Sequence, residues 1–328
     1  MKFIKIIVSN FLRVGISIIL LYLLFRQVDR KALFEIIRGA DKGLLFLAFC
    51  IFFFSYLLCI FRWEMLLKAV NIHLSLKRII ISFSGGVFFS LFLPSTIGGD
   101  LMRSIDLATH TKRPHEVVAT VLLDRLSGYV GLVLLALLSL GFGWKVVQDK
   151  GVILAIAIIT AVLIIVLFTL FNKFIYSKIS SALHSPKAGK FQQLVKDLHQ
   201  EMHYFRRHKK VIINNLIFSI LIQTVTPLTF YVVALSLGLK IKLAYFFIYL
   251  PIIGAITLLP ISIGGLGLRD YATITFFAKA GVTNNLAFAM SLISFFFILV
   301  YAAIGGLIYV LTVRHRRIQH HKLVPLHP

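Results

Sequence analysis

The sequence predicts an all-α polytopic membrane protein, and composition is the first reason. Of its 328 residues, 59% are hydrophobic and 14% are charged, and the mean hydropathy is +0.92. Soluble domains are typically about 45–50% apolar and about 25% charged. The composition therefore excludes a soluble enzyme, a disordered chain and a small secreted disulfide scaffold. Two further observations agree: most apolar residues fall in long runs, and two shorter runs end in proline and paired glycines.

Six apolar runs are long enough to cross a bilayer. A helix needs roughly 20 apolar residues to span about 30 Å of hydrocarbon. The first run continues past the length of a signal peptide without a small-residue cleavage site, so we assign it as a span. The predicted spans are 6–25, 44–61, 117–142, 152–171, 211–237 and 286–313.

Two shorter apolar runs, 80–93 and 243–259, end in the same motif. The segments Leu93 to Arg103 and Leu259 to Arg269 both read L-P-x-x-I-G-G-x-x-x-R without a gap. Proline and paired glycines interrupt a helix, and membranes tolerate such a break only inside protein or beside a wet cavity. We therefore expect a broken-helix hairpin at each motif. Two unrelated kinks between ordinary helices are the alternative.

Positive charge predicts the orientation. The predicted cytoplasmic segments carry 22 Lys and Arg and the outer segments carry nine, which places both termini in the cytoplasm. Residues 80–112 must then enter and leave on the cytoplasmic side, and residues 243–280 on the outer side. Two re-entrant hairpins approached from opposite sides are typical of an inverted-topology repeat. The alternative topology counts these helices as further spans and has eight.

The chain divides into four parts on this topology. The basic segment 172–210 has apolar residues at helical spacing with Lys and Arg on the opposite face, which predicts an amphipathic helix on the inner leaflet. A solvated helical hairpin is the alternative. The parts are a first membrane half (1–171), a cytoplasmic basic linker (172–210), a second membrane half (211–313) and a cytoplasmic basic tail (314–328).

Candidate substrate-binding residues lie at the two motifs. A helix that begins at paired glycines offers free N–H groups and a positive dipole end. Glycine lets a phosphate approach closely, and an arginine one turn later can bind its oxygens with two donors. The residues are Gly98, Gly99 and Arg103 in the first motif, and Gly264, Gly265 and Arg269 in the second.

Acidic residues accompany both arginines. Asp100 and Asp270 lie close to Arg103 and Arg269 in the sequence, so they could neutralise them in an empty site or carry a proton. A purely structural Arg–Asp pair is the alternative for each.

A further charged pair, Asp124 and Arg125, lies in the run 117–142. Ionisable residues inside a membrane helix are functional candidates by default, and we include both in the substrate site. Snorkelling to the cytoplasmic interface is the alternative. Arg62 and Trp63, at the end of the span 44–61, are expected to anchor that helix at the interface.

We expect no catalytic site, no metal and no cofactor. The chain contains no G-x-x-x-x-G-K-[ST] loop, no H-E-x-x-H and no G-x-S-x-G, which are the motifs of phosphate, zinc and serine-hydrolase sites. The formal charge of +23 is expected to face anionic lipid head groups, and we expect no nucleic-acid partner.

The chain resembles the flippase-like membrane domain of lysylphosphatidylglycerol synthases over nearly its whole length. The resemblance is carried by Phe61-Arg62-Trp63, by the two motifs from Leu93 and from Pro260, and by Asp124-Arg125 with Gly128. The family pattern usually has Glu at the position of Asp270. In the full synthases a soluble domain transfers lysine from tRNA, and no such domain remains here once the spans are assigned. The resemblance thus implies lipid translocation, not aminoacyl transfer.

We therefore expect a lipid transporter or flippase in the cell membrane. It would bind an anionic membrane lipid (a phospholipid or a polyprenyl phosphate) at the paired Gly-Gly helix starts and work by alternating access. The alternative is an intramembrane enzyme, or a subunit beside an envelope-biosynthesis enzyme, in glycolipid or cell-envelope synthesis. Nothing in the sequence sets an oligomeric state.

Overall fold

A computed structural model of the chain is mostly helical over the residues that it describes. The structure describes residues 15, 17–20, 22, 24, 26, 28–92, 96–143, 149–171, 208–257, 262 and 265–323, and no strand occurs among them. The helices, in chain order, are α2 (Arg30–Arg38), α3 (Lys42–Ala69), α4 (Leu76–Phe92), α5 (Thr96–Thr111), α6 (Pro114–Gly143), α7 (Lys150–Phe171), α10 (Lys209–Ser236), α11 (Leu243–Thr257), α12 (Leu268–Ala278) and α13 (Asn284–Leu323).

Five of these helices are long and apolar enough to cross a bilayer, which confirms the predicted fold class. They are α3, α6, α7, α10 and α13, and they coincide with five of the six predicted spans. The remaining span, 6–25, lies mostly outside the described residues, as does nearly all of the linker 172–210. Helix α13 continues to Leu323, so it extends past the predicted span 286–313 into the predicted tail.

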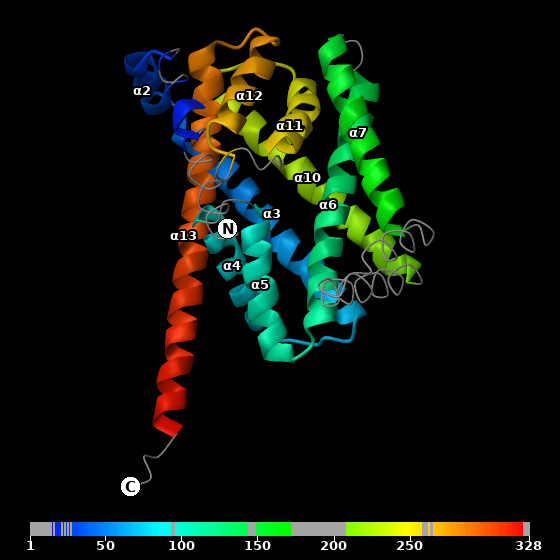
Figure 1. Cartoon of the computed structure of the whole chain (residues 1–328). Helices are drawn as coiled ribbons and strands as arrows, with labels where there is room; N and C mark the ends of the chain where they lie inside the picture. The colour runs from blue at the N-terminus through cyan, green and yellow to red at the C-terminus, as the bar shows by residue number, and fades with distance from the viewer. Residues whose placement is uncertain are drawn as a thin grey trace.

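The two predicted hairpins correspond to two pairs of shorter helices. In Figure 1, α4 and α5 lie side by side in the lower half of the molecule, and α5 leads into α6 at the bottom. The pair α11 and α12 lies in the upper half, and α12 leads into α13 at the top. The two pairs thus approach the middle from opposite ends. Their re-entrant placement in a bilayer, and the inverted repeat, stay predictions.

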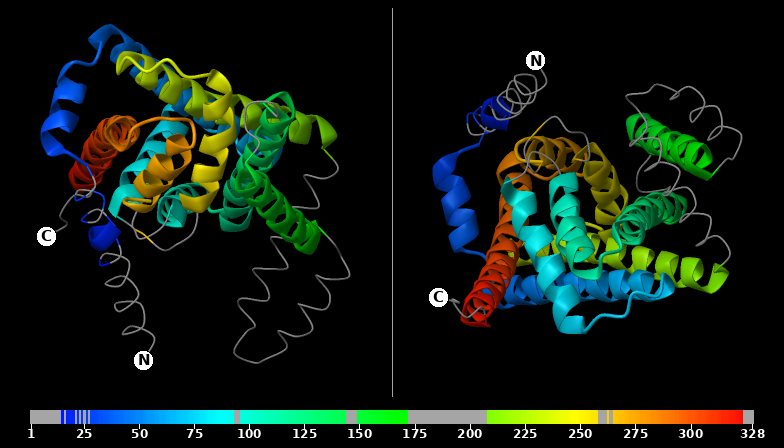
Figure 2. Two further views of the ribbon diagram at one scale, coloured as in Figure 1. Left: turned by 90° about the horizontal axis from the view of Figure 1, so that it is seen from above. Right: turned by 60° about the horizontal axis from the view of Figure 1, so that its bottom comes forward.

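Helices α3 and α10 hold the two halves together. They run side by side along one edge of the bundle in both views of Figure 2. Helix α6 packs on α10 at Gly131, where an added Cβ would lie 2.9 Å from the backbone carbonyl carbon of Ser219. Because only glycine fits there, α6 and α10 approach closely, and the polar residues of both helices come within hydrogen-bonding distance.

The glycine pair of the first motif packs helices together. Helix α5 begins at Thr96, so the expectation that it starts at Gly98 and Gly99 is wrong, and the pair lies within its first turn. A Cβ on Gly99 would lie 1.8 Å from Ser90 Oγ and 2.2 Å from the carbonyl oxygen of Gly86. Gly99 therefore allows α5 to lie directly against α4, because any larger side chain would collide with the α4 backbone.

Candidate functional site

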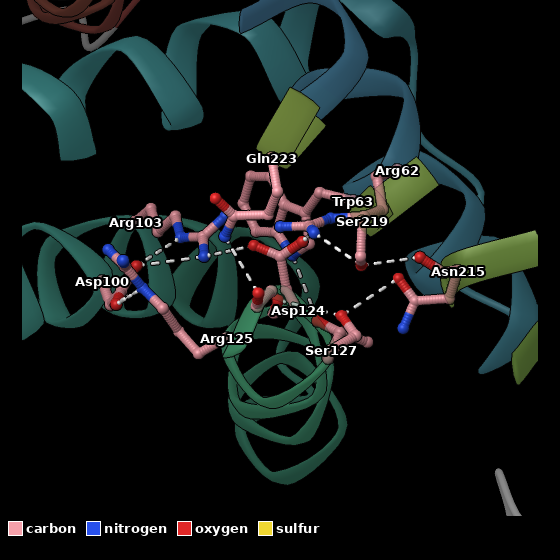
Figure 3. A network of polar contacts seen from close by, with 12 residues as sticks. Arg62, Trp63, Asp100, Arg103, Asp124, Arg125, Ser127, Asn215, Ser219 and Gln223 are labelled. Atoms are coloured by element: carbon pink, nitrogen blue, oxygen red, sulfur yellow. Dashed lines mark hydrogen bonds and ion pairs between the residues drawn. The ribbon is translucent and has the colours of Figure 1, made fainter. Parts of the chain in front are cut away.

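A network of buried charges connects α3, α5 and α6, and Asp124 of α6 lies at its centre. Arg62 Nε donates to Asp124 Oδ1 at 2.7 Å, and Arg103 Nη2 donates to Asp124 Oδ2 at 2.8 Å. The three side chains are 4–7% exposed. Figure 3 shows both guanidinium groups converging on this carboxylate. Two arginines share one buried carboxylate, so the cluster carries an excess of positive charge.

A second carboxylate, Asp100, extends the network toward Arg125. Arg103 Nε donates to Asp100 Oδ1 at 3.0 Å, and Arg125 Nε donates to Asp100 Oδ2. The side chain of Arg125 is 35% exposed, far more than those of Arg62 and Arg103. The network therefore runs from a buried end at Arg62 to an accessible end at Arg125.

Polar residues of α10 support the buried end. Arg62 Nη1 donates to Ser219 Oγ at 2.9 Å, and Ser127 Oγ donates to Asn215 Oδ1 at 3.2 Å. Gln223 Nε2 donates to the Gly128 carbonyl at 2.9 Å. These contacts tie α10 to α3 and α6 (Figure 3), as expected for polar residues between membrane helices.

Aromatic rings surround the guanidinium of Arg103. Its Cζ lies 4.8 Å from the ring centroid of Trp63 and 5.3 Å from that of Phe83, distances at which a ring face attracts a cation. Trp63 is fully buried and its Nε1 donates to Thr120 Oγ1 at 3.2 Å. The expectation that Trp63 is an interfacial anchor is therefore wrong, because it packs between α3, α4 and α6.

One donor of this network has no acceptor. Arg103 Nη1 is buried and makes no hydrogen bond, although the other two nitrogens of the same guanidinium are bonded to Asp100 and Asp124. An unpaired buried donor costs about 1–3 kcal/mol, and more when it is charged. The atom is therefore in place to bind an acceptor from outside the chain.

A cavity of about 400 Å³ lies beside this arginine. Its walls combine the charged network with apolar side chains from α4, α10 and α13. Leu266, just before α12, also lines it, and Leu266 stands at the motif position that Asp100 holds in the first copy. The described lining residues are Tyr56, Cys59, Arg62, Phe83, Gly86, Val87, Ser90, Leu91, Gly99, Asp100, Arg103, Asp124, Arg125, Gly128, Tyr129, Ile222, Gln223, Leu266, Phe295 and Ile298.

The second motif forms a separate cluster. Asp270 Oδ2 accepts from the N–H of Gly267 at 3.0 Å, and its Oδ1 accepts from Ser291 Oγ and from Arg269 Nη2 at 3.2 Å. Helix α12 begins at Leu268 with Gly267 as N-cap, φ 78°, so the expected helix start at Gly264 and Gly265 is wrong here as well. The carboxylate of Asp270 itself occupies the start of α12, where an anion was expected.

The structure brings together part of the predicted site. Five of the ten candidate residues line the cavity: Gly99, Asp100, Arg103, Asp124 and Arg125. Gly98 directly precedes Gly99 in α5, and Gly264 lies outside the described residues. Gly265, Arg269 and Asp270 are not among the described lining residues. Substrate binding by all ten stays a prediction.

Arg269 reaches the edge of the cavity through one lining residue. Its Cζ lies 5.0 Å from the ring centroid of Phe295, and Phe295 is part of the cavity wall. The two aligned arginines thus have different surroundings: Arg103 lines the cavity, whereas Arg269 only contacts its wall.

Arg62 is the functional candidate that sequence reasoning missed. It was expected at the interface, but it is 6% exposed and lines the cavity. The positions of Arg62 and Asp124 along their helices indicate that the two residues can meet. Arg62 lies seven residues before the end of α3 and Asp124 ten residues after the start of α6, so both lie about 10–15 Å from those helix ends.

Comparison with known proteins agrees with this architecture. A family model described as "Lysylphosphatidylglycerol synthase TM region" matches residues 10–306. The chain belongs to this family. Two relatives of this chain are described as UPF0104 membrane proteins. One, from Pyrococcus horikoshii, is 23% identical over 93% of this chain and 96% of its own length. The other, from Methanothermobacter thermautotrophicus, is 24% identical over 79% and 82%.

Family membership and the five candidate spans make the chain a multi-pass membrane protein of a family related to lipid metabolism. Figure 3 shows the neighbouring residues Arg62 and Trp63 of α3 together with the neighbouring residues Asp124 and Arg125 of α6. Both pairs belong to the buried charge network or its aromatic surroundings.

Proposed function

We propose that this protein binds the anionic head group of a membrane lipid in the cavity beside Arg103 and moves that lipid between the two leaflets. The observation that carries the proposal is the buried, unpaired Nη1 of Arg103, since Arg103 lines the cavity together with Arg62 and Arg125.

Phosphate is the group that best suits these donors. Guanidinium–phosphate hydrogen bonds are charge-assisted and about twice as strong as neutral ones. Arg103 has one nitrogen without a partner and Arg125 is the most exposed arginine of the network, so these two are the residues that we expect to bind the ligand. A phosphate oxygen on Arg103 Nη1 would satisfy the buried donor, and the exposed end of the network at Arg125 would be the entrance.

The rest of the cavity suits the apolar part of a lipid. Phe83, Val87, Leu91, Ile222 and Ile298 line it together with the charged residues, so a head group and the upper part of an acyl or prenyl chain could occupy it together. The cavity lies where the pair α4–α5 meets Leu266 and Phe295 of the second half. Movement of one half against the other would then open it to one leaflet at a time, as in transporters built from repeats.

Lipid binding can be tested with the two aligned arginines. Purified full-length protein is incubated with dioleoyl phosphatidylglycerol, and bound lipid is measured by native mass spectrometry. Arg103→Gln should weaken binding about tenfold to a hundredfold, since it removes one charge-assisted contact. Arg269→Gln is the matched comparison: Arg269 is not among the described lining residues, so binding should stay at the wild-type level, and a loss would instead place the second motif in the site. Arg103→Lys should restore binding only in part, because it lacks the planar donor pair.

Two results would contradict the binding proposal. One is wild-type lipid binding by Arg103→Gln. The other is full recovery of binding in Arg103→Gln/Asp100→Asn, which would mean that Arg103 serves only to neutralise Asp100. Thermal unfolding of each variant in detergent shows whether a loss of binding is a loss of folding.

Movement of the lipid is tested separately, in proteoliposomes that contain fluorescent phosphatidylglycerol. Protein-dependent exposure of inner-leaflet lipid to an external quencher is expected, and it should fall in Arg103→Gln. Chemical conversion of the lipid by the purified protein, without translocation, would instead support an intramembrane enzyme.

A further inference from the structure

Asp100 is bonded to both arginines that are proposed to bind the lipid phosphate. We propose that Asp100 is a resident counter-ion which the lipid phosphate displaces, and that its charge restricts the cavity to singly charged anions. This inference rests on the proposed function of the same cavity.

The two carboxylates of the network differ in how firmly they are held. Asp124 is bonded to Arg62 and Arg103 from two helices, and its side chain is 5% exposed. Asp100 is bonded to Arg103 and Arg125, and its side chain is 12% exposed. Because Arg125 is the accessible end of the network, a ligand that enters there meets Asp100 before Asp124.

Asp100 also competes directly for the proposed ligand donors. Its Oδ1 accepts from Nε of Arg103 at 3.0 Å, and the unpaired Nη1 belongs to the same guanidinium. Its Oδ2 accepts from Arg125. A phosphate oxygen on Nη1 of Arg103 would share that guanidinium with Asp100 and would therefore compete with Asp100 for its positive charge.

The second copy of the motif shows that this position need not be charged. Leu266 aligns with Asp100 and lines the same cavity. The second copy therefore places an apolar side chain at the motif position where the first copy adds a charge to the cavity.

The charge of the cavity favours one negative charge on the ligand. Among the described lining residues, three arginines face two aspartates, which leaves one net positive charge. A phosphodiester carries one negative charge and balances it. A phosphomonoester carries about −1.5 to −2 near neutral pH, so it would leave uncompensated negative charge in a site of low dielectric, where charge imbalance is costly.

The test compares two lipids with the same acyl chains, one a phosphodiester and the other a phosphomonoester. Purified full-length protein in neutral detergent at pH 8 is titrated with dioleoyl phosphatidylglycerol and dioleoyl phosphatidic acid, and both are measured by native mass spectrometry. Wild type should prefer phosphatidylglycerol. Asp100→Asn should shift the ratio of the two dissociation constants toward phosphatidic acid by about tenfold or more.

Asp106→Asn is the matched control. Asp106 lies on the same helix and pairs with an arginine, Arg78, at 2.8 Å, but it is not among the described residues that line the cavity. Its substitution removes one carboxylate and one ion pair of α5 and should leave the lipid ratio unchanged.

Leu266→Asp tests whether the net charge of the cavity selects the ligand, and it does so without removing a residue of an ion pair. It adds a carboxylate at the equivalent motif position and should weaken binding of both lipids at least about tenfold, since it cancels the net positive charge. Unchanged phosphatidylglycerol binding in this variant would overturn the inference, whether or not Asp100→Asn folds.

The outcomes separate this inference from the proposed function. If wild type shows no Arg103-dependent binding of either lipid, the proposed function fails and the inference fails with it. If wild type binds but Asp100→Asn leaves the ratio of dissociation constants as it was, only the counter-ion role of Asp100 is overturned.

Discussion

Arg62 of α3 donates to Asp124 of α6 at 2.7 Å, and both residues are buried. Each comes from a different part of the chain, and Asp124 also accepts from Arg103 of α5. This one carboxylate therefore determines how three helices meet at the cavity. Breaking a buried ion pair leaves an uncompensated charge, which costs far more than the pair contributes over an apolar contact.

Asp124→Asn should destabilise the protein strongly. It leaves two buried arginines without their shared carboxylate, and losses of about 3–5 kcal/mol are typical of such changes. Glu64→Gln is the control on α3, since Glu64 pairs with Lys68, which is 54% exposed, and exposed pairs contribute little. Thermal unfolding in detergent measures both, and equal midpoints for the two variants would contradict the role of Asp124.

Gly99→Ala should disrupt the contact between α4 and α5. The new methyl group would lie 2.2 Å from the carbonyl oxygen of Gly86, so the two helices would have to move apart. Ser90→Ala should not rescue it, because the backbone clash remains. Gly141→Ala in α6, which meets nothing within 4 Å, is the control. The yield of folded protein and the unfolding midpoint are the measurements, and a neutral Gly99→Ala would refute the packing role.

Asp270→Asn should lower stability without changing lipid specificity. The side chain caps α12 through the Gly267 N–H and also accepts from Ser291, and loss of a cap costs about 0.5–2 kcal/mol. Unfolding midpoints and the phosphatidylglycerol titration are measured on the same preparation. A variant of normal stability that no longer binds lipid would place Asp270 in the ligand site instead.

Labelling of single cysteines can test the predicted orientation of the chain in the membrane. In a background without Cys50 and Cys59, single cysteines at Asn71 and His208 should react with a membrane-impermeant maleimide only after the cytoplasmic side is exposed. A cysteine at Gln148 should react from outside. Labelling of position 208 from the outside would overturn both the orientation and the inverted repeat.

Asp149 and Lys279 should couple α7 to α12 in a pH-dependent way. Lys279 Nζ lies 2.5 Å from Asp149 Oδ2, and this hydrogen bond lowers the pKa of Asp149 below its ordinary value of 3.8. A lowered pKa means that the contribution to stability is present above pH 3.8 and is lost as the pH falls through the pKa of the folded state. Because the pair is partly exposed, Asp149→Asn should reduce the unfolding midpoint only slightly.

The midpoint difference between wild type and Asp149→Asn should be largest near neutral pH and should shrink as the solution is acidified. Lys279→Gln should produce the same profile, and the double variant should show no further loss. A difference that grows toward low pH would contradict the assigned ion pair.

The sequence alone determined the helical membrane fold and much of the charge network. Hydrophobic runs are local, so five spans and the short helix pairs beside each motif could be placed from residue order. Asp100 and Arg103 were identified from the repeated motif, and Asp124 and Arg125 because a charge in an apolar run is unusual wherever the helix lies.

Only the tertiary structure decided which charges meet. Arg62 and Arg103 share Asp124 because α3, α5 and α6 converge, and nothing in the local pattern of any one helix specifies that pairing. The same holds for the two motifs: they are alike in sequence, yet Arg103 lines a cavity and Arg269 binds the carboxylate that caps its own helix. Local sequence sets where a helix forms and which residues it carries, whereas the packing of neighbouring helices sets which partner each buried charge finds.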